Sequence, residues 1–314
     1  MKFAVVLTLA VILDEIIGDP RNFPHPVRLI GHAVNFWHKI FFRHDSFFHG
    51  LAVVIMTLIT AGLFVFSALY FSGGFVILQV YLLYSALAWR DLKDETLPVL
   101  LSLMTHDIDG ARKFLSFVVG RDTENLNEAE ISRAVIETVA ENSVDGVMSV
   151  IFFAALGHVV NDCYGMCVSV WLFKSASTLD SMLGYESFGK FGTPLARLDD
   201  ILNFIPARIA GVIIIMAGFF TGGNVRESLR VFLSDRLKHK SPNSAHGESA
   251  FAGVLGVRLG GGAFYGGEFE AGEFLNECGN VPGVCDIIRA WRVLDVSCWI
   301  ACVISVMAVL ILEA

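Results

Sequence analysis

The sequence predicts an all-α, polytopic integral membrane protein with about four to six transmembrane or re-entrant helices joined by polar, motif-bearing loops. Hydrophobic residues make up 54% of the 314 residues and charged residues only 17%, whereas charged residues make up about 25% of an ordinary soluble protein. No Asp, Glu, Lys or Arg occurs from Ser46 to Trp89. A large soluble helical protein with an apolar core is the less favoured alternative.

The apolar segments predict the helices in order. Phe3–Ile17 is predicted to be a first helix that is retained as a signal anchor, because it leads into Asp14 and Glu15 without a small-x-small cleavage site. Residues 46–89 are long enough for two spans of about 20 residues, with Ser72–Gly74 as the turn between them. The remaining candidate spans are Val147–Phe173, Ile201–Phe220 and Val293–Leu312.

The direction of the spans stays open. The candidate span Val147–Phe173 is interrupted by the polar pair Asn161-Asp162. If it crosses once, the polar segment Lys174–Asp200 faces away from the Lys- and Arg-rich segments, which the positive-inside rule makes cytoplasmic. A re-entrant segment that turns at Asn161-Asp162 would bring Lys174–Asp200 back, and later loops would then need a further correction.

The polar segment that precedes the candidate span Val147–Phe173 predicts an amphipathic helix at the membrane interface. Asn127 followed by Glu130 has the spacing of a capping box. The helix carries Ile131, Val135 and Val139 on one side and acidic residues on the other.

The end of that helix, ETVAENSVDG, gathers acidic side chains beside an apolar run. Glu137 and Glu141 are four residues apart, so they share one helix face, and Asn142 and Asp145 follow near its end. Like charges at this spacing need a positive partner, such as a divalent metal or a cationic substrate. The alternative is a solvated helix face, but charge at a membrane boundary is costly unless it is paired or functional.

Three further segments carry polar groups. LDEIIGDPRNFPHPVRLIG (residues 13–31) forms a rigid elbow that presents Asp19, His25 and Arg28, or else a simple Pro-rich connector. KSASTLDSMLGY and ARLDDILNFIPAR follow, and the second holds an acidic pair suited to Mg²⁺ between arginines that suit phosphate or snorkel to the interface. SPNSAHGESAFAGVLGVRLGGGAFYGG offers many hydrogen-bonding groups and a Gly260–Gly262 run that lets backbone N–H groups approach an anion, or that marks only a turn.

The cysteines carry no clear metal signature. Cys163/Cys167 and Cys298/Cys302 are spaced by four residues inside apolar segments, which favours small buried residues over metal ligands. Cys278 and Cys285 lie in a polar loop without zinc-like spacing.

Together the strings GDPRNFPHPVRLIG, ETVAENSVDGV, TLDSMLGY, ARLDDILNFIPAR and SPNSAHGESAFAGVLGVRLGG resemble the CobD/CbiB family, the adenosylcobinamide-phosphate synthases of cobalamin biosynthesis. The resemblance implies a single membrane-embedded domain over residues 1–314 and a multi-pass protein of the cell (inner or cytoplasmic) membrane. The chain has Ser177, Gly247 and Val150 where the family usually has Asn, Pro and Pro. None of these differences removes a carboxylate or an arginine.

The resemblance also implies the reaction. ATP would drive amide formation between adenosylcobyric acid and (R)-1-amino-2-propanol or its O-phosphate, with Mg²⁺ as cofactor, the corrinoid as substrate and an acyl phosphate as the simplest intermediate. Expected partners are the lipid bilayer and other late corrin-pathway membrane enzymes. The net charge of -8 argues against a nucleic-acid partner.

We assign roles to the residues at positions that match the family's motifs, according to the chemistry of each side chain. His25 or Glu248 is expected to be the base that deprotonates the amine. The expected catalytic residues are His25, Glu137, Glu141, Asp145, Asp180 and Glu248. The expected substrate- or phosphate-binding residues are Asp19, Arg28, Asn142, Lys174, Ser181, Arg197, Asn203, Arg208, Ser241, Asn243, Ser244, Arg258, Gly260 and Gly261. The expected Mg²⁺ ligands are Glu137, Glu141, Asp199 and Asp200.

Two rival functions remain. A membrane corrinoid-binding or transport protein without ligase activity would use Asn161-Asp162 in a translocation path. A non-catalytic scaffold for the late corrin pathway would have little use for so many paired acids and arginines.

Overall fold

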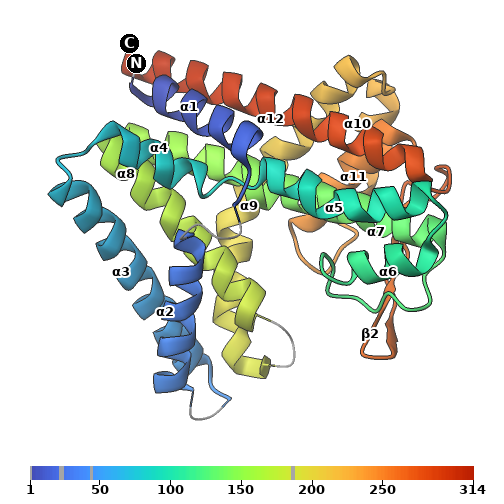
Figure 1. The fold of residues 1–314 in the computed structure, drawn as a ribbon, viewed down its shortest axis with the longest axis horizontal. Coiled ribbons are helices and arrows are strands. Elements are labelled where there is room, and N and C mark those ends of the chain that lie inside the picture. Colours follow the sequence, from blue (N-terminus) through green and yellow to red (C-terminus); the bar gives the residue numbers. More distant parts are fainter. Residues whose placement is uncertain (1, 21–24, 43–44, 185–187) are drawn as a thin grey trace. The chain divides into compact units, whose positions relative to one another are not determined.

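The structure is a computed structural model that describes residues 2–20, 25–42, 45–184 and 188–314. It is almost entirely helical (Figure 1). The helices are α1 (Lys2–Ile17), α2 (Pro26–Phe41), α3 (Phe47–Phe71), α4 (Val76–Tyr84), α5 (Trp89–Met104), α6 (Ile108–Leu115), α7 (Glu128–Ser143), the π-helix η1 (Val144–Met148), α8 (Ser149–Leu183), α9 (Gly189–Thr221), α10 (Val225–Asp235), α11 (Ser244–Leu255) and α12 (Val284–Glu313). The strands are β1 (Leu259–Gly260), β2 (Ala263–Tyr265), β3 (Glu268–Glu270) and β4 (Phe274–Leu275).

Four helical stretches in the described chain are long and apolar enough to cross a membrane. They are Phe47–Phe71, Glu128–Leu183, Gly189–Thr221 and Val284–Glu313. This finding confirms the predicted all-α, polytopic membrane fold. The helix α1 begins and ends as expected, but with 16 residues it is too short to be one of the four.

The chain forms two compact units. Unit 1 consists of Met1–Ala88, Ser149–Asn203 and Cys302–Ala314, and unit 2 consists of Trp89–Met148 and Phe204–Ala301. The helices α9 and α12 each contribute residues to both units. The single functional domain expected from the sequence stays a prediction.

The segment 46–89 contains one long helix instead of two. The turn at Ser72–Gly74 is present, and Gly73 and Gly74 have φ angles of 63° and 68°, which favour glycine. The following helix α4, however, has only nine residues. At 1.5 Å per residue it is about 14 Å long, far short of the roughly 30 Å of a bilayer core. The prediction of a second span in this segment is therefore wrong.

The helix α8 folds back on itself at Asn161 and Asp162. Asp162 has φ 46° and ψ -137°, outside the helical region. The Ser169 hydroxyl donates to the Phe153 carbonyl over 2.6 Å, although 16 residues of straight helix would separate the two by about 24 Å. Of the two alternatives that the sequence left open, the structure has the reversal at Asn161-Asp162 and not one straight helix over Val147–Phe173.

The two arms of this hairpin pack closely because the facing residues are small. A Cβ atom on Gly157 would lie 2.2 Å from the Gly165 carbonyl oxygen, and one on Gly165 would lie 2.1 Å from the Gly157 oxygen. Only glycine fits at such an approach. The second arm continues to Leu183 and α9 begins at Gly189, so the described part of the predicted Lys174–Asp200 loop is mainly helical.

The helix α7 begins with the predicted capping box. The Asn127 side chain accepts from the Glu130 N–H at 3.0 Å, and the Glu130 carboxylate accepts from the Asn127 N–H at 2.8 Å. Ten of its 16 residues are buried, because α5, α6, α11 and β1 pack against it. It is thus more deeply enclosed by protein than an interfacial position predicts.

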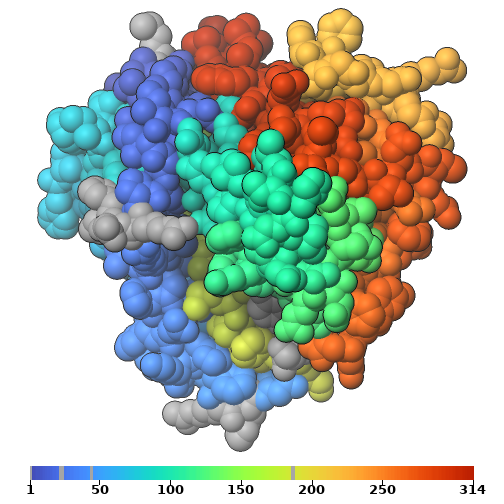
Figure 2. Space-filling model, turned by 45° about the vertical axis from the view of Figure 1, so that its right-hand side comes forward, coloured from blue at the N-terminus to red at the C-terminus, as the bar shows by residue number. Residues whose placement is uncertain are grey.

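The rest of unit 2 surrounds α7 with helices and two short antiparallel ladders. The segment that forms α5 and α6 lies at the surface in the space-filling view (Figure 2). Leu97 and Leu101 of α5 and Phe114 of α6 are exposed. Every residue of α11 from Ala245 to Leu255 is buried. β1 pairs with β4, and β2 pairs with β3, which places the glycine-rich segment beside α7.

Candidate functional site

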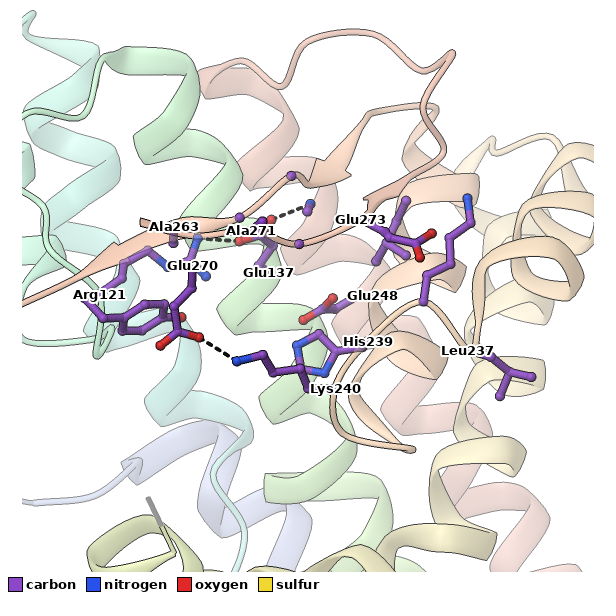
Figure 3. A pocket seen from close by; sticks show the side chains of 17 residues that line it. Arg121, Glu137, Leu237, His239, Lys240, Glu248, Ala263, Glu270, Ala271 and Glu273 are labelled. Carbon is purple, nitrogen blue, oxygen red and sulfur yellow. Dashed lines mark hydrogen bonds and ion pairs between the residues drawn. The ribbon is translucent and has the colours of Figure 1, made fainter. Parts of the chain in front are cut away.

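Unit 2 contains a pocket of about 410 Å³ with charged side chains of both signs in its wall (Figure 3). Four parts of the chain contribute: the loop before α7, α7 itself, the segment between α10 and α11 with the start of α11, and the strands β1 to β4. Its ionisable residues are Arg121, Glu137, Lys238, His239, Lys240, Glu248, Tyr265, Glu270 and Glu273. Glu137, Glu248, Gly260 and Gly261 are the sequence-predicted residues among its lining.

Glu137 holds the centre of this site. Its side chain is buried, and its Oε2 lies 2.6 Å from the Arg121 Nη1 while its Oε1 accepts from the Gly260 N–H at 2.7 Å. The Arg133 Nε lies 3.8 Å from the same Oε1. The positive partner predicted for the acidic face is therefore supplied by two arginines of the chain itself.

The Gly260–Gly262 run lies against the Glu137 carboxylate, which accepts a hydrogen bond from the Gly260 N–H. Gly260, Gly261 and Gly262 have φ angles of 74°, 88° and 87°, a region that favours glycine. The Gly260 N–H points at the carboxylate, and the carbonyls of Gly260 and Gly262 accept from the Arg133 guanidinium. A Cβ on Gly260 would lie 2.3 Å from the Glu273 carbonyl oxygen, so the close approach requires glycine.

Glu248 and Glu141 add two further carboxyl groups. Glu248 is only 7% exposed. Burial raises its pKa well above the ordinary value, the charges of Glu141 and Glu137 raise it further, and Arg121 partly offsets them. Glu141 accepts a hydrogen bond from the Ser244 hydroxyl at 3.1 Å. Glu137 and Glu141 thus both meet the α11 and β1 region, as their four-residue spacing on one helix face predicts.

Basic residues at the edge of the pocket form ion pairs. The Lys238 Nζ lies 2.8 Å from the Asp235 Oδ1, and the Lys240 Nζ lies 2.8 Å from the Glu270 Oε2 (Figure 3). The hydrogen bond to Asp235 raises the pKa of Lys238. Sequence reasoning missed both lysines, because nothing in their immediate neighbourhood indicates a pocket.

Other predicted residues of unit 2 lie around the start of α11. The Arg208 guanidinium lies 3.5 Å from the Asn243 Oδ1 and stacks 3.4 Å from the centroid of the Phe204 ring. The Ser241 hydroxyl accepts from the Asn243 N–H at 3.3 Å. Asn142 caps its own helix by donating to the Thr138 carbonyl.

Two more predicted residues of this unit have local surroundings of their own. The Arg258 guanidinium lies over the Phe274 ring at 4.8 Å, and Asp145 lies in the π-helix η1, an element often found at functional sites. His246, on α11, is fully buried, and burial lowers its pKa to about 4, with Arg208 and Arg236 contributing. This histidine is therefore neutral at physiological pH.

The remaining predicted residues belong to unit 1. His25 caps α2, accepting from the Val27 N–H at 3.3 Å, and its Nε2 lies 3.2 Å from the Asp19 Oδ1. Part of this elbow, residues 21–24, lies outside the described residues. The other unit 1 residues are Arg28 on α2, Lys174, Asp180 and Ser181 on α8, and Arg197, Asp199, Asp200 and Asn203 on α9.

Within unit 1, Asn203 holds Asp199 in place. Its amide donates to the Asp199 Oδ2 at 3.1 Å, and its Oδ1 accepts from the Ser149 hydroxyl at 2.8 Å. Asn203 is 1% exposed. A buried amide with both ends bonded fixes the orientation of one member of the acidic pair.

Sequence reasoning also missed Arg121 and Arg133. Arg133 was within reach, because it lies four residues before Glu137 on a predicted helix, where opposite charges meet. Arg121 lies in the loop before the helix, 16 residues from its partner, and no local pattern marks it.

Comparison with known proteins identifies the family. The sequence profile described as CobD/Cbib protein matches residues 7–294. A "Cobalamin biosynthesis protein CobD" of Clostridium perfringens is 35% identical over 319 residues, covering 98% of this chain and 99% of the relative. Proteins of the same name from Pelobacter propionicus and Listeria monocytogenes are 40% and 38% identical, covering 87% and 83% of this chain and 84% of each relative.

No solved structure matches the chain. The profile covers nearly all of the described helices, and the relatives match over most of their own length. The chain belongs to the CobD/CbiB family.

Proposed function

We propose that this protein acts in cobalamin biosynthesis as an ATP-dependent amide ligase that joins adenosylcobyric acid to (R)-1-amino-2-propanol or its O-phosphate. The names of its relatives support the role in cobalamin biosynthesis. The ligase chemistry rests on the family resemblance and on the groups in the pocket of unit 2.

The observation that carries the proposal is the buried Glu248 carboxyl group, which lines the same pocket as the Glu137–Arg121 ion pair. Glu141 and Glu137 raise the pKa of Glu248 by repulsion, and a cationic ammonium group next to them would relieve that repulsion. The site therefore favours an amine substrate bound as its ammonium form. A carboxylate whose pKa is raised is a stronger base than an ordinary one, so Glu248, once ionised beside that cation, is suited to accept the ammonium proton.

The reaction needs two displacements. A carboxylate oxygen of the corrinoid attacks the terminal phosphorus of ATP and ADP leaves, which gives an acyl phosphate. The amine nitrogen, after Glu248 has taken its proton, attacks the acyl carbon, and inorganic phosphate leaves as the amide forms. Lys238, Lys240 and Arg121 would bind phosphate oxygens at the pocket edge.

Mg²⁺ fits some of the predicted ligands better than others. Both Glu137 oxygens are engaged by Arg121 and Gly260, so Glu137 does not fit a metal ligand in this arrangement. Glu141 of unit 2 fits by its hard oxygen donors, since Mg²⁺ in nucleotide sites is held by one or two carboxylates together with substrate phosphates. The Asp199–Asp200 pair of unit 1 offers donors of the same kind, as a separate set. A bound Mg²⁺ would neutralise phosphate charge.

The test uses detergent-purified protein with adenosylcobyric acid, the aminopropanol phosphate and Mg-ATP, with free aminopropanol in parallel. We expect the amide product by mass and ADP release that requires both other substrates. The Glu248→Gln variant should lose product while Glu227→Gln, an exposed acid of the same unit that does not line the pocket, retains it. Corrinoid binding without ATP turnover would contradict the ligase and favour a carrier or scaffold.

A transport function gains nothing from Asn161-Asp162. This turn is the reversal point of the α8 hairpin, and the Asp162 side chain is 56% exposed and lies 3.8 Å from the Lys2 amine. The turn and the ion pair with Lys2 account for these two residues without a translocation path.

A further inference from the structure

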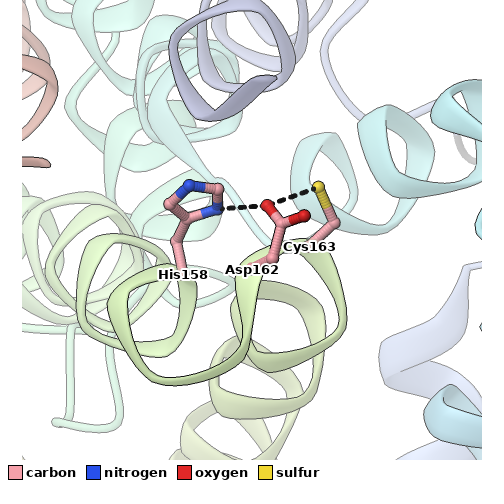
Figure 4. Close-up of side chains that lie close together, drawn as sticks. All are labelled: His158, Asp162 and Cys163. Carbon is pink, nitrogen blue, oxygen red and sulfur yellow. Dashed lines mark hydrogen bonds and ion pairs between the residues drawn. The ribbon is translucent and has the colours of Figure 1, made fainter. Parts of the chain in front are cut away.

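The reversal point of α8 gathers three side chains that could share a metal ion (Figure 4). The imidazole of His158, the carboxylate of Asp162 and the thiol of Cys163 each offer one atom, and these atoms all lie within 4.8 Å of one another. His158 and Cys163 are buried and Asp162 is exposed. All three belong to unit 1, and none of them lines the pocket of unit 2.

The orientation of the His158 ring is fixed from its far side. The His158 Nε2 lies 2.8 Å from the Glu313 Oε1, and the Phe3 ring packs 5.1 Å from the imidazole centroid. A carboxylate can only accept, so in the neutral ring the proton is on Nε2. The Nδ1 atom then carries a lone pair.

That lone pair points at other electron-rich atoms. The His158 Nδ1 lies 3.3 Å from the Asp162 Oδ1, yet this buried nitrogen has no hydrogen bond from the described residues. The Cys163 thiol donates a hydrogen bond to the same Asp162 oxygen over 3.3 Å. The Nδ1 lone pair and the Asp162 oxygen repel one another at this distance unless a cation or a shared proton lies between them.

We infer that His158, Asp162 and Cys163 form a binding site for a divalent zinc-type ion at the tip of the α8 hairpin. Nitrogen, sulfur and carboxylate donors together suit Zn²⁺ rather than Mg²⁺ or Ca²⁺, which prefer oxygen alone. Glu313 takes the place of the carboxylate that commonly orients a zinc-bound histidine through its other nitrogen. Binding releases the Cys163 thiol proton to solvent, and water completes the coordination.

Of the two neighbouring cysteines Cys163 and Cys167, only Cys163 is placed to be a metal ligand. Both thiols are buried and lie one turn apart on the second arm of α8, but only Cys163 belongs to the His158 cluster. Lys2 lies 3.8 Å from the Asp162 Oδ2 and is the charged group that an incoming cation would displace. The site links the first arm of α8 to the second and, through Glu313, to α12.

The test uses the full-length protein in detergent, stripped with a chelator and then given Zn²⁺ or Co²⁺. We expect a single Zn²⁺ per chain after gel filtration, and for Co²⁺ a sulfur-to-metal charge-transfer band in the absorption spectrum. This band needs no variant, so it tests thiolate ligation even where a substitution prevents folding. Wild-type protein that retains no Zn²⁺ and gives no such band would overturn the inference.

Variants assign the ligands. His158→Gln and Cys163→Ser should lose Zn²⁺ binding, while Cys167→Ser, the matched control, should keep it. Glu313→Gln should weaken the affinity roughly 10–100-fold, as expected for a group that orients a ligand. Equal Zn²⁺ binding by Cys163→Ser and wild type, or equal loss in Cys167→Ser, would overturn this assignment.

Discussion

Arg121 and Glu137 form an ion pair inside the pocket wall, with 2.6 Å between the Arg121 Nη1 and the Glu137 Oε2. The two side chains are only 17% and 7% exposed. Arg121 lies in the loop before α7 and Glu137 lies on α7, so the ion pair holds the loop against the helix. The Gly260 N–H donates to the same Glu137 carboxylate. Both the shape of the pocket and the charge on Glu248 depend on this pair.

Removal of one partner of this pair should strongly destabilise the fold. Arg121→Ala leaves the Glu137 carboxylate buried without its nearest cation, and a broken buried pair costs about 3–5 kcal/mol. Thermal unfolding in detergent measures the effect. The double variant Arg121→Met with Glu137→Leu should be more stable than either single variant, because no buried charge is left alone.

An exposed pair provides the control. Arg230 and Glu227 are 61% and 42% exposed, and such pairs contribute about 0.2–1 kcal/mol. Arg230→Ala should therefore change the free energy of unfolding little. Similar losses for Arg121→Ala and Arg230→Ala would contradict the view that burial gives the first pair its importance.

Gly260→Ala should disturb both the fold and the Glu137 contact. Gly260 has φ 74°, and the new Cβ would lie 2.3 Å from the Glu273 carbonyl oxygen. A side chain in this backbone region costs about 1–3 kcal/mol, and the clash adds to it. Gly222 has φ 82°, and a Cβ added there would meet no atom of the described residues within 4 Å, so Gly222→Ala measures the backbone cost alone.

The comparison of these two variants by thermal unfolding isolates the close approach. We expect Gly260→Ala to have a clearly lower melting temperature than Gly222→Ala and reduced ligase turnover. Equal melting temperatures would show that the β1–β4 segment moves to accept a side chain, and the tight cradle around Glu137 would then be unsupported.

Glu248 should make stability fall as the pH rises. Its pKa is raised in the folded protein, so between the ordinary Glu pKa of about 4.3 and the folded value the native state binds more protons than the unfolded state. Stability is then full below the unfolded pKa and is lost as the pH rises through the folded pKa, by up to about 1.4 kcal/mol per pH unit.

Glu248→Gln keeps the shape of the side chain and removes this titration. Melting temperatures of wild type and variant from pH 5 to 8 should diverge in favour of the variant as the pH increases. The low pKa of His246, about 4, acts equally in both proteins and cancels from the difference. Parallel curves would mean that Glu248 has the same pKa in the folded and the unfolded protein, which would contradict the raised pKa on which its role as the base rests.

Short-range signals in the sequence predicted the local structure well. The Asn127–Glu130 capping box, the Ser72–Gly74 turn and the end of α1 depend on residues within a few positions of one another. The break at Asn161-Asp162 was also visible, because two polar residues interrupt an apolar run. In each case the physical cause lies inside the segment itself.

Long-range pairing explains what local patterns left out. Arg121 lies 16 residues before Glu137 in the sequence, and Gly260 lies 123 residues after it. These residues meet only because the loop before α7 and the β1 segment pack on α7. The length of α4 is decided by where its chain meets α1 and α8, which composition does not encode. The glycine run was expected to bind a substrate or phosphate group, which stays a prediction; in the structure the Gly260 N–H donates to the Glu137 carboxylate.

The α8 hairpin gives a final prediction through Gly157. A Cβ there would lie 2.2 Å from the Gly165 carbonyl oxygen and 2.1 Å from the Ser169 hydroxyl, so Gly157→Ala should push the two arms apart and lower the melting temperature. Gly62 of α3 is the matched control, because its Cβ would meet only the Leu172 side chain at 3.4 Å. There the higher helix propensity of Ala should stabilise the protein by up to about 1 kcal/mol. The two substitutions are chemically identical, so opposite signs of the effect would come from the close approach of the arms. A stabilising Gly157→Ala would mean that α8 does not fold back at Asn161 and Asp162 in the membrane.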